Sequence, residues 1–195
     1  AGEQRESFSL LEKVVLLQGV KMFRHVPLEY FPSIAKCCTA IWRERDALVC
    51  RQSEPTDATL YIVADGALGL FKANSTSPAT PAGIPKSSSA KATLDRLRRS
   101  LIVPDEAVEL GIMVRKLQAS DTMGNTGLLC DTEWPYSAKA LEDTWLLCIN
   151  RRDLTDMLRG RREMASAVIH GLFKTFTRRI QLLKDHVAVR RDSCF

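Results

Sequence analysis

The stretch from Thr122 to Glu142, T-M-G-N-T-G-L-L-C-D-T-E-W-P-Y-S-A-K-A-L-E, indicates the fold more clearly than any other part of the sequence. Gly124 predicts a turn, and the apolar pair Leu128 and Leu129 predicts a short helix after it. A polar loop and an alternating run then predict a strand. Because the first amides of a helix have no intrahelical partner and lie at the positive end of its dipole, we expect this turn to attract an anion.

Short apolar runs separated by polar turns lie on both sides of this stretch. Their spacing of roughly 8–12 residues, with breakers such as Pro55 and Gly66, is typical of an antiparallel sandwich or barrel. We therefore predict an α+β fold that is mainly β, an antiparallel β-roll or jelly-roll-like barrel. The expected strands are Ile41–Trp42, Ala47–Cys50, Leu60–Val63, Ala67–Phe71, Leu110–Leu117, Tyr136–Ala140 and Trp145–Ile149.

Two helices are predicted before the strands. Ser9 and Glu12 have the spacing of a capping box, and the apolar stripe that follows them ends at Gly19. A second short helix is expected between Tyr30 and Cys38.

Two further helices are expected after the strands. Asn150 or Asp153 is suited to cap the first of them, which ends at Gly160. The second is long and carries a single apolar stripe, which suits it to lie across a sheet or to pair with a partner. The residues of this expected interaction face are Val168, Leu172, Phe176, Ile180 and Leu183.

The segment between the two sets of strands has a different composition. Small polar residues and prolines dominate Ala73–Ser89, so too little apolar surface is present to offset the entropy of ordering. We expect residues 73–107 to form a mostly disordered insertion, with a helix-like part at Ala90–Leu101. Ser100 follows two arginines, which fits either a kinase recognition motif or a solvated loop end. The sequence does not decide whether Ser100 is phosphorylated.

Length and composition favour one globular domain. A chain of 195 residues is long enough for one substantial core. We expect residues 9–189 to form this domain, with 1–8 as a tail or linker and 190–195 as a second tail. The abrupt opening of the sequence suggests a piece of a longer protein.

Charge and hydropathy exclude some partners. The net charge of +5 permits acidic partners, and we interpret the basic segment Arg151–Arg191 as a solvated helix face that does not contact nucleic acid directly. No apolar run approaches the roughly 20 residues of a membrane-spanning helix. The six cysteines form no regular framework and no secretion signal is evident, which indicates an intracellular location on the cytoplasmic side.

Motifs for catalysis or metal binding are not evident in the sequence. The histidines His25, His170 and His186 are isolated, and the last two are not one helical turn apart. No P-loop, no G-x-S-x-G and no cysteine–histidine pair stands out. We therefore expect neither enzymatic activity nor a metal site.

The order of the expected elements resembles that of the cyclic-nucleotide-binding domain family. Two short helices, a β-roll interrupted at a glycine turn and a trailing pair of helices follow one another from about Leu10 to Leu183. Leu60–Gly66 resembles the family's strand, tyrosine and glycine turn, and Gly124 with Leu128 resembles its phosphate-binding cassette. The resemblance implies a regulatory module in which a ligand at the cassette biases the position of the following helices.

Two cassette positions depart from the family pattern. The family's glutamate, which accepts the ribose hydroxyl, is replaced by Asn125, and its arginine, which pairs with the cyclic phosphate, is replaced by Trp134. Losing these contacts would cost about 3–5 kcal/mol, or roughly two to four decades of affinity. We therefore expect no cofactor, and usual cyclic AMP or cyclic GMP binding that is impaired or absent.

Three interpretations of the pocket stay open. In the first, Trp134 and Tyr136 pack inward and the site is collapsed. In the second, another small ligand is held by the amides of Asn125 to Gly127 and stacks on Trp134. In the third, a cyclic nucleotide binds weakly, with Arg115 or Lys139 as a substitute cation. The candidate ligand-binding residues are Gly124, Asn125, Thr126, Gly127, Leu128, Trp134, Pro135 and Tyr136.

The sequence thus predicts a non-catalytic regulatory or sensory module of a larger protein. The alternative is a ligand-free interaction or dimerisation module, in which the last helix docks another domain of the parent protein, a partner helix or a second copy. The turns at 43–46 and 52–54 lack the glycines that the family usually has. We expect their geometry to have changed, because other residues disfavour a positive φ.

Overall fold

The computed structural model describes residues 8–73 and 110–192. Ser100, the helix-like part at 90–101 and most of the expected insertion lie outside the described residues. The expected limits of the domain need two corrections. Phe8, assigned to a tail, is 6% exposed, and its ring meets that of Trp145 edge to face with 5.6 Å between centroids. Residues 190–192, assigned to the second tail, continue the last helix.

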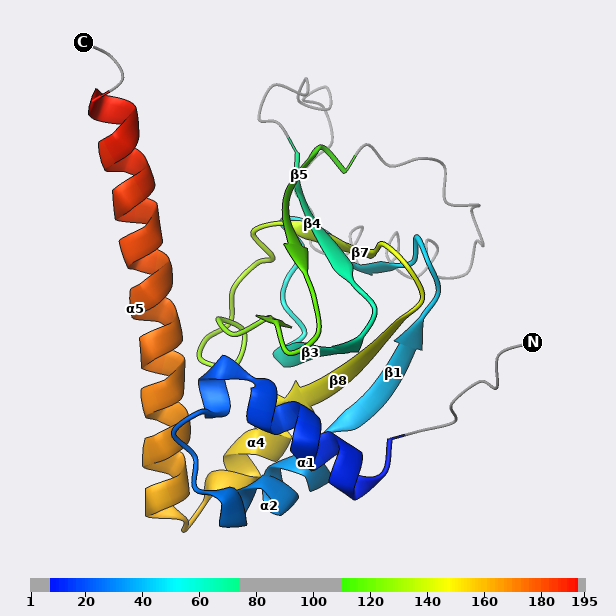
Figure 1. The fold of residues 1–195 in the computed structure, drawn as a ribbon, viewed down its shortest axis with the longest axis vertical. Coiled ribbons are helices and arrows are strands. Elements are labelled where there is room, and N and C mark those ends of the chain that lie inside the picture. The colour runs from blue at the N-terminus through cyan, green and yellow to red at the C-terminus, as the bar shows by residue number, and fades with distance from the viewer. Residues whose placement is uncertain (1–7, 74–109, 193–195) are drawn as a thin grey trace, which may run out of the picture.

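Within the described residues, eight strands form two four-stranded antiparallel sheets (Figure 1). The strand order is β1-β8-β3-β6 in the first sheet and β2-β7-β4-β5 in the second. The predicted β-roll is confirmed, although β6 was missed because it has only two residues. The bounds are β1 Thr39–Arg43, β2 Leu48–Cys50, β3 Thr59–Asp65, β4 Leu68–Lys72, β5 Ile112–Leu117, β6 Thr122–Met123, β7 Ser137–Ala140 and β8 Thr144–Asn150.

Strand β3 is buried on both faces, so its alternating side chains enter two separate cores. Leu60 and Ile62 belong to a helix-side core, which the first sheet shares with the helices. Tyr61 and Val63 belong to a roll core, which the first sheet shares with the second. The candidate site lies beside β3, because β6 pairs with it immediately before the cassette.

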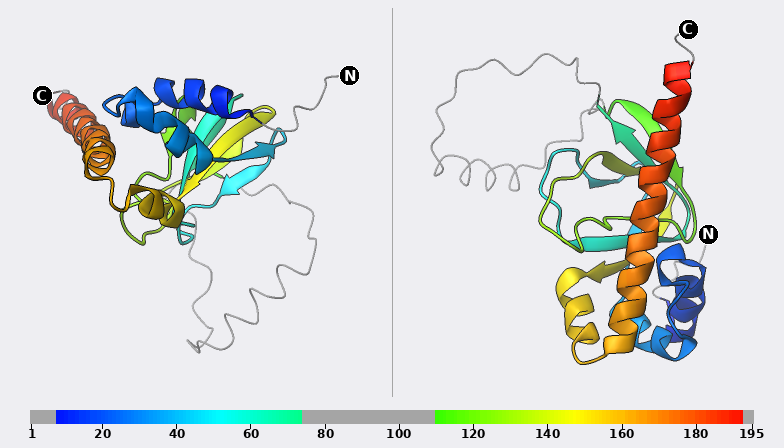
Figure 2. Two further views of the ribbon diagram at one scale, coloured as in Figure 1. Left: turned by 90° about the horizontal axis from the view of Figure 1, so that it is seen from below. Right: turned by 90° about the vertical axis from the view of Figure 1, so that its left-hand side faces the viewer.

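The helices gather at one end of the sheets, and α5 runs on alongside them (Figures 1 and 2). The predicted capping box is confirmed, since Ser9 N–H donates to Glu12 Oε2 at 2.8 Å and Glu12 N–H donates to Ser9 Oγ at 3.3 Å. Of the two caps considered for α4, Asn150 is the one used. The bounds are α1 Leu10–Gly19, α2 Phe31–Lys36, α4 Arg151–Leu158 and α5 Arg162–Asp192, with short 3-10 helices η1 Lys21–Phe23 and η2 Leu28–Tyr30.

Helix α5 is long, but apolar and charged residues are interspersed along it. Its first half packs against η1 and α4, and Figure 2 shows its C-terminal half extending past α1, α2 and α4. In residues 8–73 and 110–192, neither α5 nor any other helix combines the length and apolar character that crossing a membrane requires.

The turns without glycine keep a left-handed backbone, contrary to the expectation that their geometry has changed. Asp46 has φ +69° and Ser53 has φ +64°. In the first turn, Asp46 N–H donates to the carbonyl oxygen of Ala140, and its carboxylate accepts from Lys139 at 2.7 Å. Tertiary bonds of this kind offset the modest cost of a positive φ in a residue other than glycine.

Candidate functional site

Gly124 begins the cassette directly after β6. Its φ is +85°, a left-handed conformation that a side chain disfavours. A Cβ atom at this position would lie 2.2 Å from the carbonyl oxygen of Thr59 and 3.2 Å from Cη2 of Trp134. The close approach of the cassette to β3 therefore requires glycine here.

The cassette continues as turns over residues 125–129. The N–H groups of Leu129 and Cys130 both donate to the carbonyl oxygen of Thr126, at 3.0 and 3.1 Å. The short helix predicted here is reduced to this single turn, because the chain then leaves to pair with the turn after β2. The amides of residues 125–128 have no acceptor within the described part of the chain. They are free backbone donors, but they do not form the start of a regular helix.

Asn125, which the resemblance places at the family's glutamate position, is enclosed by protein. Its side chain is 1% exposed, and neither Oδ1 nor Nδ2 has a hydrogen-bond partner among the described residues. An unpaired buried polar group costs roughly 1–3 kcal/mol. This side chain is therefore destabilising unless a water molecule or a ligand bonds to it.

Trp134, which the resemblance places at the family's arginine position, is buried in the roll core. The backbone N–H of Trp134 donates to the carbonyl oxygen of Glu54, and the backbone carbonyl oxygen of Trp134 accepts from the N–H of Ser53, both at 2.8 Å. These bonds fix the loop, and the indole ring is 5% exposed. Its centroid lies 6.2 Å from that of Tyr61. The position agrees with the first interpretation of the pocket, and the ring face that a stacked ligand would need is largely covered.

The other predicted site residues do not converge on one point. Tyr136 is partly buried against the roll core, whereas Pro135 and Thr126 are exposed. Gly127 is buried next to Thr56, whose Oγ1 would lie 3.2 Å from an added Cβ atom. The structure thus brings Gly124 and Trp134 together but does not gather all eight candidates around one cavity.

Neither expected substitute cation is free. The guanidinium of Arg115 lies 3.5 Å from the carboxylate of Asp121, and the ammonium of Lys139 lies 2.7 Å from that of Asp46. The Lys139 contact lowers the pKa of the Asp46 carboxyl from its ordinary value, first through the hydrogen bond and then through the lysine charge. Both cations are occupied within the fold, which weakens the third interpretation of the pocket.

Two contacts connect the cassette to the helices. Leu128 is 6% exposed and belongs to the helix-side core, which also contains Leu154 of α4 and Val168 of α5. The guanidinium of Arg151, at the start of α4, pairs with the carboxylate of Asp131 in the cassette loop. A displacement of the cassette would therefore disturb both C-terminal helices.

The expected interaction face of α5 requires a correction. Val168 and Leu172 are buried in the helix-side core, and Phe176 packs partly against it. The first half of the stripe is therefore used inside the domain, because this part of α5 already packs against η1 and α4. The side chains of Ile180 and Leu183 lie outside the described residues. Among the side chains of α5 that the structure describes, Ile169 and Phe173 are large, apolar and exposed, at 51% and 69%.

The histidines are less isolated than the sequence suggested. The rings of His25 and His170 lie 5.2 Å apart between centroids, although 145 positions separate them in the chain. No motif signals such a pair, because only the packing of α5 on η1 brings it together. Within residues 8–73 and 110–192, no group of three or more His, Cys, Asp or Glu side chains is placed to hold a metal ion.

Comparison with known proteins identifies the fold. No family model matches the sequence, and no curated protein matches it significantly. Among solved structures, it is similar to a cyclic nucleotide-binding domain from Methylobacillus flagellatus, with a TM-score of 0.64 and 14% identity over 93% of this chain and 83% of that one. The catabolite activator protein of Thermus thermophilus also matches, with a TM-score of 0.64 and 18% identity over 88% of this chain and 63% of that one.

A third match extends this likeness to a regulatory protein of another kind. The regulatory domain of Toxoplasma gondii PKA, solved with cAMP, matches with a TM-score of 0.55 and 16% identity over 80% of this chain and 48% of that one. The chain therefore has the fold of cyclic-nucleotide-binding domains. It spans about half to two thirds of the length of the Toxoplasma and Thermus proteins.

Proposed function

We propose that this chain is a non-catalytic regulatory module that has the cyclic-nucleotide-binding fold but has lost the usual nucleotide contacts. The observation that carries the proposal is the position of Trp134. Its ring is buried in the roll core against Tyr61 and lies next to Gly124, where the resemblance places a phosphate-binding arginine. An indole supplies no positive charge for a cyclic phosphate.

The regulatory part of the proposal rests on the connection between cassette and helices. Leu128 packs in the helix-side core, and Asp131 pairs with Arg151 at the start of α4. A ligand or partner that bound one arrangement of these elements more tightly would shift the population of α4 and α5 positions. The size of the shift is limited by the difference between its two affinities.

Calorimetric titration with cyclic AMP and cyclic GMP tests the loss of binding. We expect no binding tighter than about 10 μM, which corresponds to roughly −6.8 kcal/mol. Tighter binding of either nucleotide would contradict the proposal. A Trp134→Arg, Asn125→Glu double variant gives a further test, and circular dichroism checks its fold. If the folded variant gains nucleotide binding, the cassette frame is intact and only the two side chains were missing.

A second candidate function is an interaction module that uses α5. Ile169 and Phe173 are one turn apart and lie on a face different from that of the buried Val168 and Leu172. Exposed aromatic residues are frequent anchors of protein interfaces. We expect Phe173→Glu to abolish self-association or partner capture, measured by sedimentation velocity. Thr177→Glu, at another exposed position of α5, is the matched control, and an unchanged assembly state in both variants would count against this function.

A further inference from the structure

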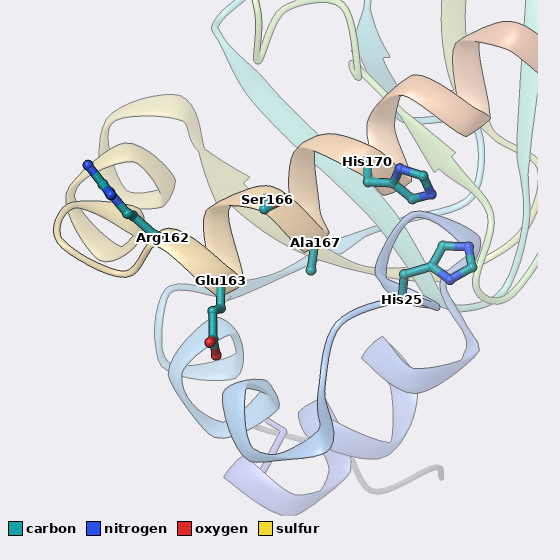
Figure 3. Close-up of a pocket in the computed structure, with 6 residues that line it drawn as sticks. All are labelled: His25, Arg162, Glu163, Ser166, Ala167 and His170. Atoms are coloured by element: carbon teal, nitrogen blue, oxygen red, sulfur yellow. The ribbon is translucent and has the colours of Figure 1, made fainter.

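A hollow of about 640 Å³ lies between α5 and the turn that follows η1 (Figure 3). None of the cassette residues lines it. Figure 3 shows the imidazoles of His25 and His170 side by side at one end, and the Glu163 carboxylate directed away from them at the other. The lining residues are His25, Arg162, Glu163, Ser166, Ala167 and His170.

A lysine contacts one of the two imidazoles. The ammonium of Lys174 lies 3.1 Å from Nε2 of His25. An ammonium only donates hydrogen bonds, so Nε2 accepts, and the proton of the neutral imidazole lies on Nδ1. His170 and Lys174 are one helical turn apart on α5 and therefore share a face. We call His25, His170 and Lys174 the basic cluster.

Within residues 8–73 and 110–192, the basic cluster forms no salt bridge with an acidic residue. The pKa of His25 is lowered from its ordinary value by the charge of Lys174, then by burial, then by His170 and by Arg24. Glu163 accepts a hydrogen bond from the Tyr30 hydroxyl at 3.3 Å. The charge of Lys174 therefore lies beside the imidazole of His25, and no carboxylate among the described residues compensates it through a salt bridge.

The contact with Lys174 discriminates between two kinds of ligand. A metal ion would need the nitrogen lone pair of His25, but an ammonium already lies against it and would repel the ion. An anion would instead accept hydrogen bonds from the ammonium and from both imidazoles. A phosphate dianion offers several acceptor oxygens to donors that converge from different directions.

We infer that the basic cluster binds the phosphate group of a small phosphate monoester. The hollow is open to solvent, so it leaves room for the group that carries the phosphate. Because His25 precedes α2 and the other two residues lie on α5, the bound phosphate joins the helix to the N-terminal part of the domain. It is a second effector site for the position of α5, independent of the cassette.

Histidine resonances report binding directly. We expect inorganic phosphate to shift the ring signals of His25 and His170 saturably, and to raise the pH at which His25 titrates. His186 is the internal reference, because its position is about 24 Å further along α5. Sodium chloride at the same ionic strength is the control for screening. Equal shifts with chloride, or shifts that do not saturate, would overturn the inference.

Two lysine variants separate a specific site from a general charge effect. Lys174→Gln keeps a donor but removes the charge, and we expect phosphate affinity to fall at least about tenfold. Lys36→Gln removes the same charge from an exposed position on α2 and should leave the affinity unchanged. Equal losses in both variants would overturn the site. Glycerol phosphate should bind more tightly than inorganic phosphate, and weaker binding would overturn the assignment to a monoester.

Discussion

The indole ring of Trp134 lies 6.2 Å from the phenol ring of Tyr61, measured between centroids, at an interplanar angle of 52°. The Tyr61 hydroxyl donates to the carboxylate of Asp57, and burial raises the pKa of this phenol. The pair joins the cassette loop to the central strand β3. A residue at a position expected to contact a ligand thus contributes to the core of the domain.

If Trp134 is a core residue, its truncation should destabilise the whole domain. We expect Trp134→Ala to lower the free energy of unfolding by about 3–5 kcal/mol, because it leaves a large cavity beside Gly124. Urea unfolding measures the change. Trp42→Ala, at a partly exposed position of β1, is the control and should cost less. A loss below about 1 kcal/mol for Trp134→Ala would show that the ring is not packed as described.

Replacement of Asn125 by an apolar residue should stabilise the domain. Because both of its polar side-chain atoms lack partners among the described residues, we expect Asn125→Leu to raise the free energy of unfolding by about 1–3 kcal/mol. Asn150→Leu is the matched control. Asn150 accepts from Arg152 N–H at 2.9 Å as the cap of α4, so its loss should cost about 1 kcal/mol. A destabilised Asn125→Leu variant would mean that Asn125 is hydrogen-bonded in solution.

The position of α5 depends on one glycine. A Cβ atom on Gly171 would lie 1.8 Å from the carbonyl oxygen of Met22. Alanine gains up to about 1 kcal/mol of helix propensity over glycine. We nevertheless expect Gly171→Ala to destabilise the domain by about 1–3 kcal/mol, because the clash is with backbone. Hydrogen exchange of the α5 amides measures the effect. Thr177→Ala should change it little, and full protection in Gly171→Ala would contradict the close packing.

The sequence predicted what depends on local patterns. The capping box of Ser9 and Glu12 was visible because its partners are three residues apart, and the strands were visible as apolar runs. The left-handed turns at Asp46 and Ser53 were not, because tertiary hydrogen bonds hold residues that carry no glycine signal. The contact of His25 with α5 was also invisible, since long-range packing alone creates it.

At the cassette, too, the sequence predicted some features and the structure was needed for others. From positions in the sequence alone, we inferred that Asn125 and Trp134 stand where the family has its glutamate and its arginine. The burial of Asn125 was not predicted. The burial of Trp134 was one of three open interpretations, because a tryptophan next to proline fits an exposed loop as well as a core. The structure was also needed to show which face of α5 is covered. Val168 and Leu172 have the same spacing whether η1 or a partner covers them.

The contact between His25 and Lys174 predicts a pH dependence of stability. The folded pKa of His25 is lowered below the ordinary 6.5 by Lys174, burial, His170 and Arg24. The unfolded chain therefore binds this proton more readily. The contribution of neutral His25 to stability is fully present above about pH 6.5, and it is lost as the pH falls from there through the folded pKa.

We expect the urea midpoint to fall between pH 7 and pH 5 by more in the wild-type chain than in His25→Gln, in buffers without phosphate. Because exposed charges are screened by salt, about 1 M sodium chloride should reduce the difference. Parallel pH profiles for the two chains at low salt would refute the described contact.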